Sequence, residues 1–208
     1  MRRGSPFGAQ EPMAEASAAN KRLDHRRVAP QGRFRRPRLY LVGEAPGAAE
    51  AAQGKPFVGP AGNALRKMLK EGGIDPGQLR LANAIPFRPI KHSRDRKPRN
   101  RSPTTDEIQC HGVAVLTDIR RSKPAVIVAL GSTAARLFGA SQSVRAARKA
   151  KLQFEGRPLR VTFHPAYARR FGGRSSDAWR DMVHDLRQAW DDSGIHSIKS
   201  LEVTGEKP

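Results

Sequence analysis

The sequence predicts a three-layer α/β/α domain around a central, mostly parallel, four-stranded sheet. Short apolar runs alternate along the chain with segments of helical periodicity, the order typical of parallel strands joined by helices. Two of these runs, at residues 39–42 and 125–130, are continuously apolar and too short for helices, as strands buried on both faces are. The chain of 208 residues is long enough for one substantial core, which we place in a single domain at residues 37–192.

The first strand is predicted at residues 39–42 (LYLV), and Gly43 ends it. A loop rich in glycine and proline follows, after which Asn63 is expected to cap a helix. Apolar residues spaced three to four positions apart give this helix one buried face, and the glycine pair at residues 72–73 ends it.

The second strand is predicted at residues 79–85, where the chain is again apolar. A proline ends it, and residues 86–103 read as a long loop rich in Arg, Lys and Pro, a length that usually has a function. Thr104 and Glu107 then form a capping box, which predicts a helix to about Ser122.

The last third of the chain contains the remaining strands and helices. Residues 125–130 (AVIVAL) predict a buried strand, and the Gly-Ser pair after it opens a short helix. Residues 151–154 and 159–163 are expected to pair as a hairpin around a glycine turn. Ser175 or Ser176 should cap a final helix, whose apolar residues are spaced to bury one face.

Two tails are expected to flank the domain. Residues 1–36 mix Arg, Ala, Gly, Pro and Gln without hydrophobic periodicity, which predicts a disordered basic tail. The apolar face of the final helix ends near Trp190, so residues 193–208 are expected to form a flexible carboxyl-terminal tail.

The charge of the chain points to a polyanionic partner. Its formal net charge is +20, concentrated in three blocks at residues 1–38, 88–101 and 143–174. Clustered Lys and Arg are typical of nucleic-acid binding, and a merely solvated surface is the alternative. A membrane surface is a weaker alternative, because none of the blocks is an amphipathic helix with a large apolar face. No stretch is apolar enough to span a membrane.

The amino-terminal residues lack the apolar segment of a secretory signal. We therefore expect a cytoplasmic protein, associated with the nucleoid if it is bacterial. Cys110 is the sole cysteine, which excludes both an intramolecular disulfide and a cluster held on four thiolates. The expectation is a monomer without metal or cofactor.

The loop after the first strand concentrates the candidate chemistry. Glu44 directly follows Gly43. Gly43 and Gly47 permit a positive φ or a close backbone approach, and Pro46 fixes the turn between them. Ligands of open α/β sheets bind beyond the carboxyl ends of the strands, which is where this loop begins. The alternative is a phosphate-binding turn with Glu44 in solvent, although the glycine spacing fits neither common nucleotide motif.

Three stretches of the chain resemble the uracil-DNA glycosylase superfamily, most closely its family 4. They are GEAPGAAEAAQGKPFVGPAG at residues 43–62, LAN at residues 81–83 and VTFHPAYARR at residues 161–170. Together the motifs span roughly residues 38–190, the size of one domain. The resemblance implies the fold of that superfamily and an enzyme that flips deoxyuridine out of DNA. Such an enzyme hydrolyses the N-glycosidic bond and leaves an abasic site.

The resemblance also implies roles for residues of these motifs. Glu44 matches the catalytic acidic residue facing the oxocarbenium-like sugar, and His164 matches the imidazole that donates to uracil O2 as the base leaves. Phe57 matches the aromatic residue on which the flipped base stacks. Asn83 matches the residue whose amide pairs with uracil N3–H and O4. The substrate-binding set is completed by Gly43, Gly47 and Ala45, the last of which stands where family 1 enzymes carry an Asp.

Basic residues of the long loop and residues of the His-Pro motif are expected to contact DNA. Relatives have a Leu that wedges into the duplex where this chain has Ala168, which leaves Tyr167 or Arg169 as substitutes. The expected DNA-binding residues are Arg94, Arg96, Lys97, Arg99, Arg101, Tyr167, Arg169 and Arg170.

The sequence departs from the family pattern in the cluster and in the basic loop. Family 4 enzymes hold an iron-sulfur cluster on four Cys, yet Phe87 stands where the third is expected and Cys110 lies beside the fourth position, His111. The cluster is therefore expected to be absent. A branch of the superfamily traps uracil-DNA covalently through a His in the basic loop. His92 lies in that loop here, but Asn100 takes the matching position.

Three alternatives to a uracil-specific enzyme stay open. One is a protein that binds damaged bases or abasic sites with little or no turnover, and another is a covalent uracil-DNA-trapping variant using the loop around His92. The third is an enzyme that also accepts hypoxanthine or xanthine, which Asn83 disfavours. The expected partners are DNA containing uracil, single- or double-stranded, and the abasic-site product.

Overall fold

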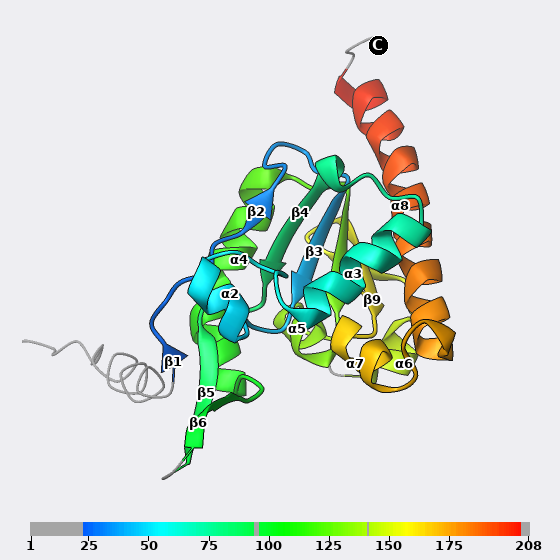
Figure 1. Ribbon diagram of the computed structural model, residues 1–208. Helices are drawn as coiled ribbons and strands as arrows, with labels where there is room; N and C mark the ends of the chain where they lie inside the picture. Colours follow the sequence, from blue (N-terminus) through cyan, green and yellow to red (C-terminus); the bar gives the residue numbers. More distant parts are fainter. Residues whose placement is uncertain (1–22, 94–95, 141, 205–208) are drawn as a thin grey trace, which may run out of the picture.

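A central sheet with helices on both faces forms the body of the molecule (Figure 1). The computed structural model describes residues 23–93, 96–140 and 142–204, and only the backbone at residues 92–93, 96–97 and 195–204. Two hydrophobic cores lie on opposite faces of the sheet. The predicted three-layer α/β/α class is therefore confirmed.

The strands of the central sheet are β2 (Gln31–Gly32), β3 (Leu39–Gly43), β4 (Leu79–Asn83), β7 (Val126–Leu130), β8 (Leu152–Phe154) and β9 (Arg157–Thr162). Their order across the sheet is β2-β4-β3-β7-β9-β8. The four inner strands are parallel, as predicted, whereas β2 and β8 pair antiparallel at the two edges. The sheet is thus wider than the predicted four strands.

The helices are α2 (Ala48–Gln53), α3 (Pro60–Glu71), α4 (Thr105–Ser122), α5 (Ser132–Leu137), α6 (Val144–Ala147), α7 (Pro165–Arg170) and α8 (Asp177–Thr204), with the 3-10 turns η1 (Pro76–Gln78) and η2 (Gly173–Ser175). Successive side chains of β3 point to opposite faces of the sheet and pack against different helices. Leu39 and Leu41 belong to the core with α3, α7 and α8. Tyr40 and Val42 belong to the core with α4, α5 and α6.

A second, smaller sheet contains β1 (Leu23–Asp24), β5 (Arg88–Ser93) and β6 (Arg96–Asn100) in the order β1-β5-β6. Figure 1 shows β5 and β6 extending away from the body as a hairpin. The interpretation of residues 86–103 as a loop is therefore wrong. The sequence does not predict these strands, because they contain Pro89, Pro98 and many charged side chains. Prolines and charged residues are depleted in strands.

The segment before β3 also differs from expectation. Residues 23–36, predicted to belong to a disordered tail, include β1 and β2, and Leu23 and Val28 are buried. Strands of two residues are too short to produce a hydrophobic period, so the sequence does not reveal them. The rest of that predicted tail, residues 1–22, lies outside the described residues.

The carboxyl-terminal helix extends past the predicted boundary. The tail expected from residue 193 is helical as far as Thr204, since α8 continues to that residue. Ser193 is buried, and its hydroxyl oxygen accepts a hydrogen bond from Arg38 Nε over 3.0 Å. This polar anchor has no hydrophobic signature in the sequence. Residues 205–208 lie outside the described residues.

Three of the four predicted helix starts agree with the structure, among them that of α5, which begins at Ser132 directly after Gly131. Thr104 and Glu107 exchange the predicted capping-box bonds at the start of α4. Ser176 accepts a hydrogen bond from the first turn of α8, which decides between the two serines considered. Asn63 is not a cap, because α3 already begins at Pro60, whose fixed φ suits the first position of a helix.

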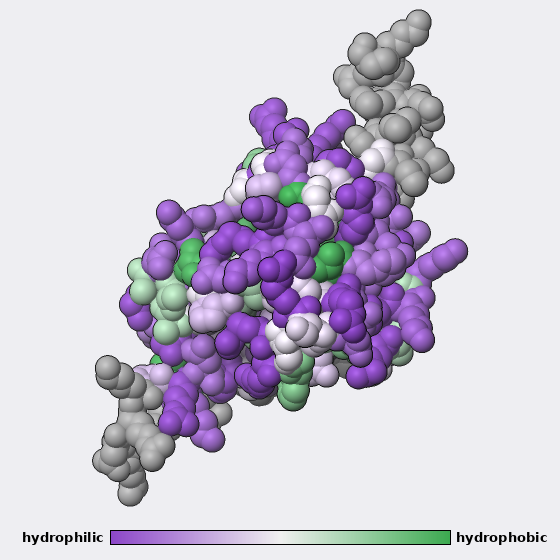
Figure 2. All heavy atoms as spheres, turned by 45° about the vertical axis from the view of Figure 1, so that its right-hand side comes forward, coloured by the Kyte–Doolittle hydropathy of each residue, from purple (hydrophilic) through white to green (hydrophobic). Residues whose placement is uncertain are grey.

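The surface is predominantly polar. On the face drawn in Figure 2, hydrophilic residues predominate and hydrophobic ones form small, separate spots. Within the described part of the chain, no helix is both long enough and apolar enough to cross a bilayer.

Candidate active site

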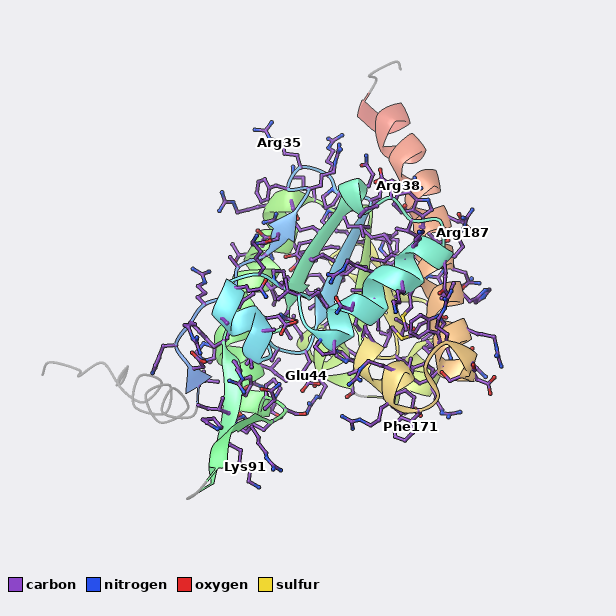
Figure 3. The ribbon with its side chains drawn as sticks, in the orientation of Figure 1. Arg35, Arg38, Glu44, Lys91, Phe171 and Arg187 are labelled. Atoms are coloured by element: carbon purple, nitrogen blue, oxygen red, sulfur yellow. The ribbon has the colours of Figure 1, made fainter. Side chains whose placement is uncertain are left out.

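Four polar side chains follow the carboxyl ends of the four parallel strands. Glu44 follows β3, Asn83 ends β4, Thr133 lies in the first turn of α5 after β7, and His164 follows β9. These strands are neighbours in the sheet, so the side chains gather at one edge of it, where open α/β sheets bind ligands. Figure 3 shows Glu44 at this end of the strands.

Gly43 is the point at which two predicted site residues converge. A Cβ atom at this position would lie 2.6 Å from Asn83 Oδ1 and 2.7 Å from Phe57 Cζ. Gly43 is paired with Asn83 in the sheet register, and its carbonyl accepts a hydrogen bond from the backbone of Ala84 over 2.9 Å. Only glycine leaves room for an aromatic edge and an amide side by side, so the side chains of the predicted Phe57 and Asn83 meet over Gly43.

Phe57 is held in a strained backbone conformation. Its φ is 56°, in the left-handed region that costs a non-glycine residue about 1–3 kcal/mol. Arg66 Nη1 donates to its carbonyl oxygen over 2.7 Å. A Cβ on Gly62 would lie 1.8 Å from the same oxygen, so α3 presses directly on this backbone. Strain fixed in this way by surrounding structure is frequent at ligand sites.

Glu44 is oriented by a residue that the sequence analysis did not select. Thr133 Oγ1 donates to Glu44 Oε2 over 3.2 Å, and Thr133 is 3% exposed. The only sequence signal for Thr133 is its position just after a buried strand, where polar residues often face a ligand.

His164 is the second residue after β9, and its ring is held by the backbone. Its Nδ1 accepts a hydrogen bond from the Ala166 N–H over 3.2 Å, so in the neutral ring the proton is on Nε2. Burial lowers the pKa of His164, and the nearby Glu44 carboxylate opposes this shift only in part. Gly131 has φ 91°, and a Cβ at this position would lie 3.0 Å from the Cβ atom of His164. The geometry therefore presents a neutral imidazole whose remaining nitrogen is a donor.

Two more contacts connect the Glu44 loop to its neighbours. Glu50, 9% exposed, accepts hydrogen bonds from the backbone N–H of Gly47 and of Gly59. Asn100 of β6 lies on the other side of the loop, where a Cβ at Gly47 would be 3.4 Å from its Nδ2. Arg88 of β5 donates to Asn100 Oδ1 over 2.6 Å, which fixes the base of the hairpin beside the loop.

The predicted DNA-binding residues are divided between exposed and paired positions. Arg99, Arg169 and Arg170 are exposed. Arg101 instead forms a two-point ion pair with the buried Glu107, so part of its charge is used inside the protein. Arg94 lies outside the described residues, and the side chains of His92, Arg96 and Lys97 are not described either.

The expected wedge position is occupied by a buried side chain. Ala168 has no exposed surface and packs in the core, so it cannot enter a duplex. Tyr167 is 39% exposed, and its ring centroid lies 4.8 Å from that of Phe171, which is 58% exposed. The sequence analysis did not select Phe171. In Figure 3 Phe171 and Lys91 of the hairpin lie on either side of Glu44, along the same edge of the molecule.

The residues near the expected cluster position do not fit an iron-sulfur cluster. The rings of Phe87 and His111 pack edge to face with centroids 5.3 Å apart, and Cys110 is exposed. A cluster needs four ligands of the thiolate kind, and the chain has one. Burial lowers the pKa of His111, as expected for an imidazole packed among apolar groups.

Comparison with known proteins decides the family. The model of the uracil DNA glycosylase superfamily matches residues 29–187, which include every side chain gathered at the strand ends. The chain belongs to the uracil DNA glycosylase superfamily. A Type-4 uracil-DNA glycosylase of Thermotoga maritima is 36% identical over 155 residues, which cover 73% of this chain and 76% of that protein. One of Pyrobaculum aerophilum is 32% identical over 154 residues, covering 70% and 74%.

Among solved structures, the crystal structure of wild-type SMUG2 from Pedobacter heparinus has a similar fold. It has a TM-score of 0.53 with 14% sequence identity and covers 75% of each chain. At this identity the likeness supports the fold alone. This chain has the superfamily fold although it has one cysteine, and the rings of Phe87 and His111 pack together near the expected cluster position.

Proposed function

We propose that this protein is a uracil-DNA glycosylase that acts in DNA repair. It flips deoxyuridine out of DNA, hydrolyses the N-glycosidic bond and leaves an abasic site. The observation that carries the proposal is the meeting of Phe57 and Asn83 over Gly43, beside Glu44 and His164, in a chain of this superfamily. This set provides one group for each requirement of the reaction.

Recognition of the base falls to Phe57 and Asn83 in this proposal. The Phe57 ring provides a surface on which uracil stacks, and its rigid backbone keeps that surface in place. The Asn83 amide accepts from uracil N3–H and donates to O4. Cytosine has the reverse pattern at these two positions, so it leaves buried polar groups unpaired and is rejected.

Glu44 and His164 stabilise the two charges that develop as the bond breaks. Positive charge grows on the sugar, and the Glu44 carboxylate, held by Thr133, faces it and positions the attacking water. Negative charge grows on the departing base, and His164 Nε2 donates to uracil O2. A neutral imidazole can fill this role, because its Nε2–H donates a hydrogen bond without the ring being protonated.

The DNA strand is bound along the edge that contains Glu44. The basic hairpin β5–β6 lies on one side, and α7, which contains Tyr167, Arg169 and Arg170, lies on the other (Figure 1). We assign the duplex wedge to Tyr167, since Ala168 is buried. The site is built from one chain, which favours a monomer. DNA as substrate and a single free thiol favour the cytoplasm.

Oligonucleotides labelled at one end and carrying a single U, hypoxanthine, xanthine or T test this function. After incubation, alkali cleaves abasic sites, and a denaturing gel separates the products. Cleavage of the U substrate alone, in single- or double-stranded form, is expected. Strong cleavage of hypoxanthine or xanthine would widen the base range. A heat- and denaturant-stable protein–DNA band would instead indicate covalent trapping, and binding without cleavage would make the protein a damage-binding protein.

A further inference from the structure

We propose that Glu50 is a positioning residue that joins the Glu44 loop to the Phe57 loop, so that the catalytic carboxylate and the base-stacking ring depend on one buried side chain. The inference rests on the proposed function. It goes beyond it by assigning the geometry of both loops to a residue that contacts neither the sugar nor the base.

The two oxygens of Glu50 serve different loops. Oε2 accepts from the N–H of Gly47, three residues after Glu44, over 3.1 Å. Oε1 accepts from the N–H of Gly59, two residues after Phe57, over 2.8 Å. Each bond lies close in sequence to the side chain it would position, so a shift of Glu50 is transmitted to both.

The carboxylate also accounts for two glycines of the sequence motif. A Cβ at Gly47 would lie 2.8 Å from Glu50 Oε2, and a Cβ at Gly59 would lie 3.0 Å from Oε1. Neither glycine has a positive φ, so backbone freedom does not explain them. Space for the Glu50 carboxylate does.

Helix electrostatics strengthen the same arrangement. Gly47 is the N-cap of α2, and Gly59 is the N-cap of α3. One carboxylate therefore lies at the amino-terminal ends of two helices, where a negative charge is favoured. An ordinary capping residue serves only its own helix. Glu50 belongs to α2 but also caps α3, and α3 presses on the strained Phe57 backbone.

The chemistry of the side chain makes the inference testable. Both partners of Glu50 are N–H donors, so both of its oxygens must accept. In Glu50→Gln the amide keeps the length but offers one acceptor only, and its NH₂ opposes the second N–H. In Glu50→Asp both acceptors and the charge remain, but the side chain is one methylene shorter and cannot reach both loops.

The experiment measures both loops in the same variants. We expect Glu50→Gln to lower kcat for single-stranded uracil-DNA by about 10- to 100-fold, because a displacement of about 1 Å has this effect. It should also weaken inhibition by free uracil about tenfold, since uracil binds against Phe57. Asp75→Asn is the matched control. Asp75 likewise accepts from a glycine N–H over 2.8 Å, but it caps η1 at the other end of β4, so both values should stay unchanged.

Amide hydrogen exchange gives a readout that does not depend on activity. The N–H groups of Gly47 and Gly59 should be protected in the wild type and should lose protection together in Glu50→Gln. If that variant does not fold, Gly59→Ala replaces it, because its methyl group would displace the carboxylate and produce the same paired losses.

Three results would overturn the inference. The first is a loss in kcat alone or in uracil inhibition alone, which would mean that Glu50 serves one loop. The second is wild-type kcat and wild-type inhibition by uracil in Glu50→Asp, which would mean that Glu50 acts only through its charge. The third is unchanged exchange at both glycines. The wild type could also lack excision activity while Gly47 and Gly59 still lose protection together in Glu50→Gln. That result would refute the proposed function but would support the connection between the two loops.

Discussion

Thr133 donates a hydrogen bond to Glu44 across 3.2 Å, from the helix that follows β7 to the loop that follows β3. The two residues are far apart in the sequence and come together only because β3 and β7 are neighbours in the sheet. A buried hydroxyl that donates to a carboxylate restricts the rotation of that carboxylate. The relationship gives Glu44 a fixed orientation at the carboxyl ends of the strands.

Glu44→Gln should slow excision by about 1,000-fold or more while uracil-DNA binding is kept, because its charge is needed mainly in the transition state. Thr133→Val, which keeps the shape, should slow it by about 10- to 100-fold, the value of a hydrogen bond to a charged group. Single-turnover rates and binding titrations measure both. Thr133→Val in the Glu44→Gln background should add little, since Thr133 acts through Glu44. Additive effects would assign Thr133 a separate role.

The basic hairpin should determine the salt dependence of binding to undamaged DNA. Each Lys or Arg that neutralises a phosphate contributes about −0.9 to the slope of log K against log salt. Replacing Arg94, Arg96, Lys97 and Arg99 by Gln should flatten that slope measurably in a fluorescence titration. Arg33→Gln with Arg35→Gln is the control, because Figure 3 places Arg35 at the opposite edge. Equal slopes in the hairpin variant and the wild type would place the hairpin away from DNA.

Phe171 should stack on a base near the flipped uracil. Base stacking on an exposed aromatic side chain contributes about 1–3 kcal/mol, so Phe171→Ala should raise KM for single-stranded DNA about tenfold. Val113→Ala is a matched control, because Val113 is also 58% exposed but lies on α4. 2-Aminopurine next to uracil, bound to the inactive Glu44→Gln protein, should lose fluorescence on binding. The same loss with Phe171→Ala would refute this contact.

Acid should destabilise the protein through His164 before most carboxylates are protonated. Its folded-state pKa lies below the ordinary value of 6.5, so the unfolded chain takes up the proton first as pH falls. The contribution of His164 to the free energy of unfolding is therefore constant above about pH 7. Below that pH it declines by at most about 1.4 kcal/mol per pH unit. Urea unfolding at pH 7.5 and 5.5 measures the decline, and His164→Gln should reduce it.

His111 provides the second part of the same prediction. Burial also lowers the pKa of His111, while Glu107 opposes this shift. As for His164, the unfolded chain therefore takes up the proton first, and the stability of the fold decreases as the pH falls. His111→Gln should remove a further part of the decline between the two pH values. If neither substitution changes the pH dependence of unfolding, the two rings are protonated in the folded protein as readily as in the unfolded chain.

The sequence reveals the site wherever a residue lies at or just beyond the end of a buried strand. Glu44, Asn83 and His164 are of this kind, because continuous apolar runs predict parallel strands whose ends meet at one edge. Thr133 and Glu50 were missed, since their roles depend on hydrogen bonds between segments that no local pattern connects. The capping role of Glu50 was also not recognisable, because the N-cap of α2 is Gly47, whereas a capping-box signature has Ser or Thr at this position.

Asn83→Asp gives the most specific test of base recognition. A site built to pair with a base edge rejects the wrong edge by leaving buried groups unpaired, with effects of about 10⁴ or more. The substitution removes the donor to uracil O4, so excision of uracil should fall by at least about 1,000-fold. The new carboxylate can accept from the cytosine amino group or, when protonated, donate to its N3.

A weak activity on cytosine is therefore expected in Asn83→Asp, and it should be strongest in unpaired DNA, where flipping costs least. Alkali treatment of labelled strands carrying U or C measures both activities side by side. Asn63→Asp, the same change at an exposed position of α3, should leave base preference unchanged. Asn83 Oδ1 and the edge of the Phe57 ring converge on the same point over Gly43, so the new carboxylate of Asn83→Asp would lie beside the stacking surface for the base. Wild-type activity on uracil in Asn83→Asp would therefore mean that the base is recognised by a different residue.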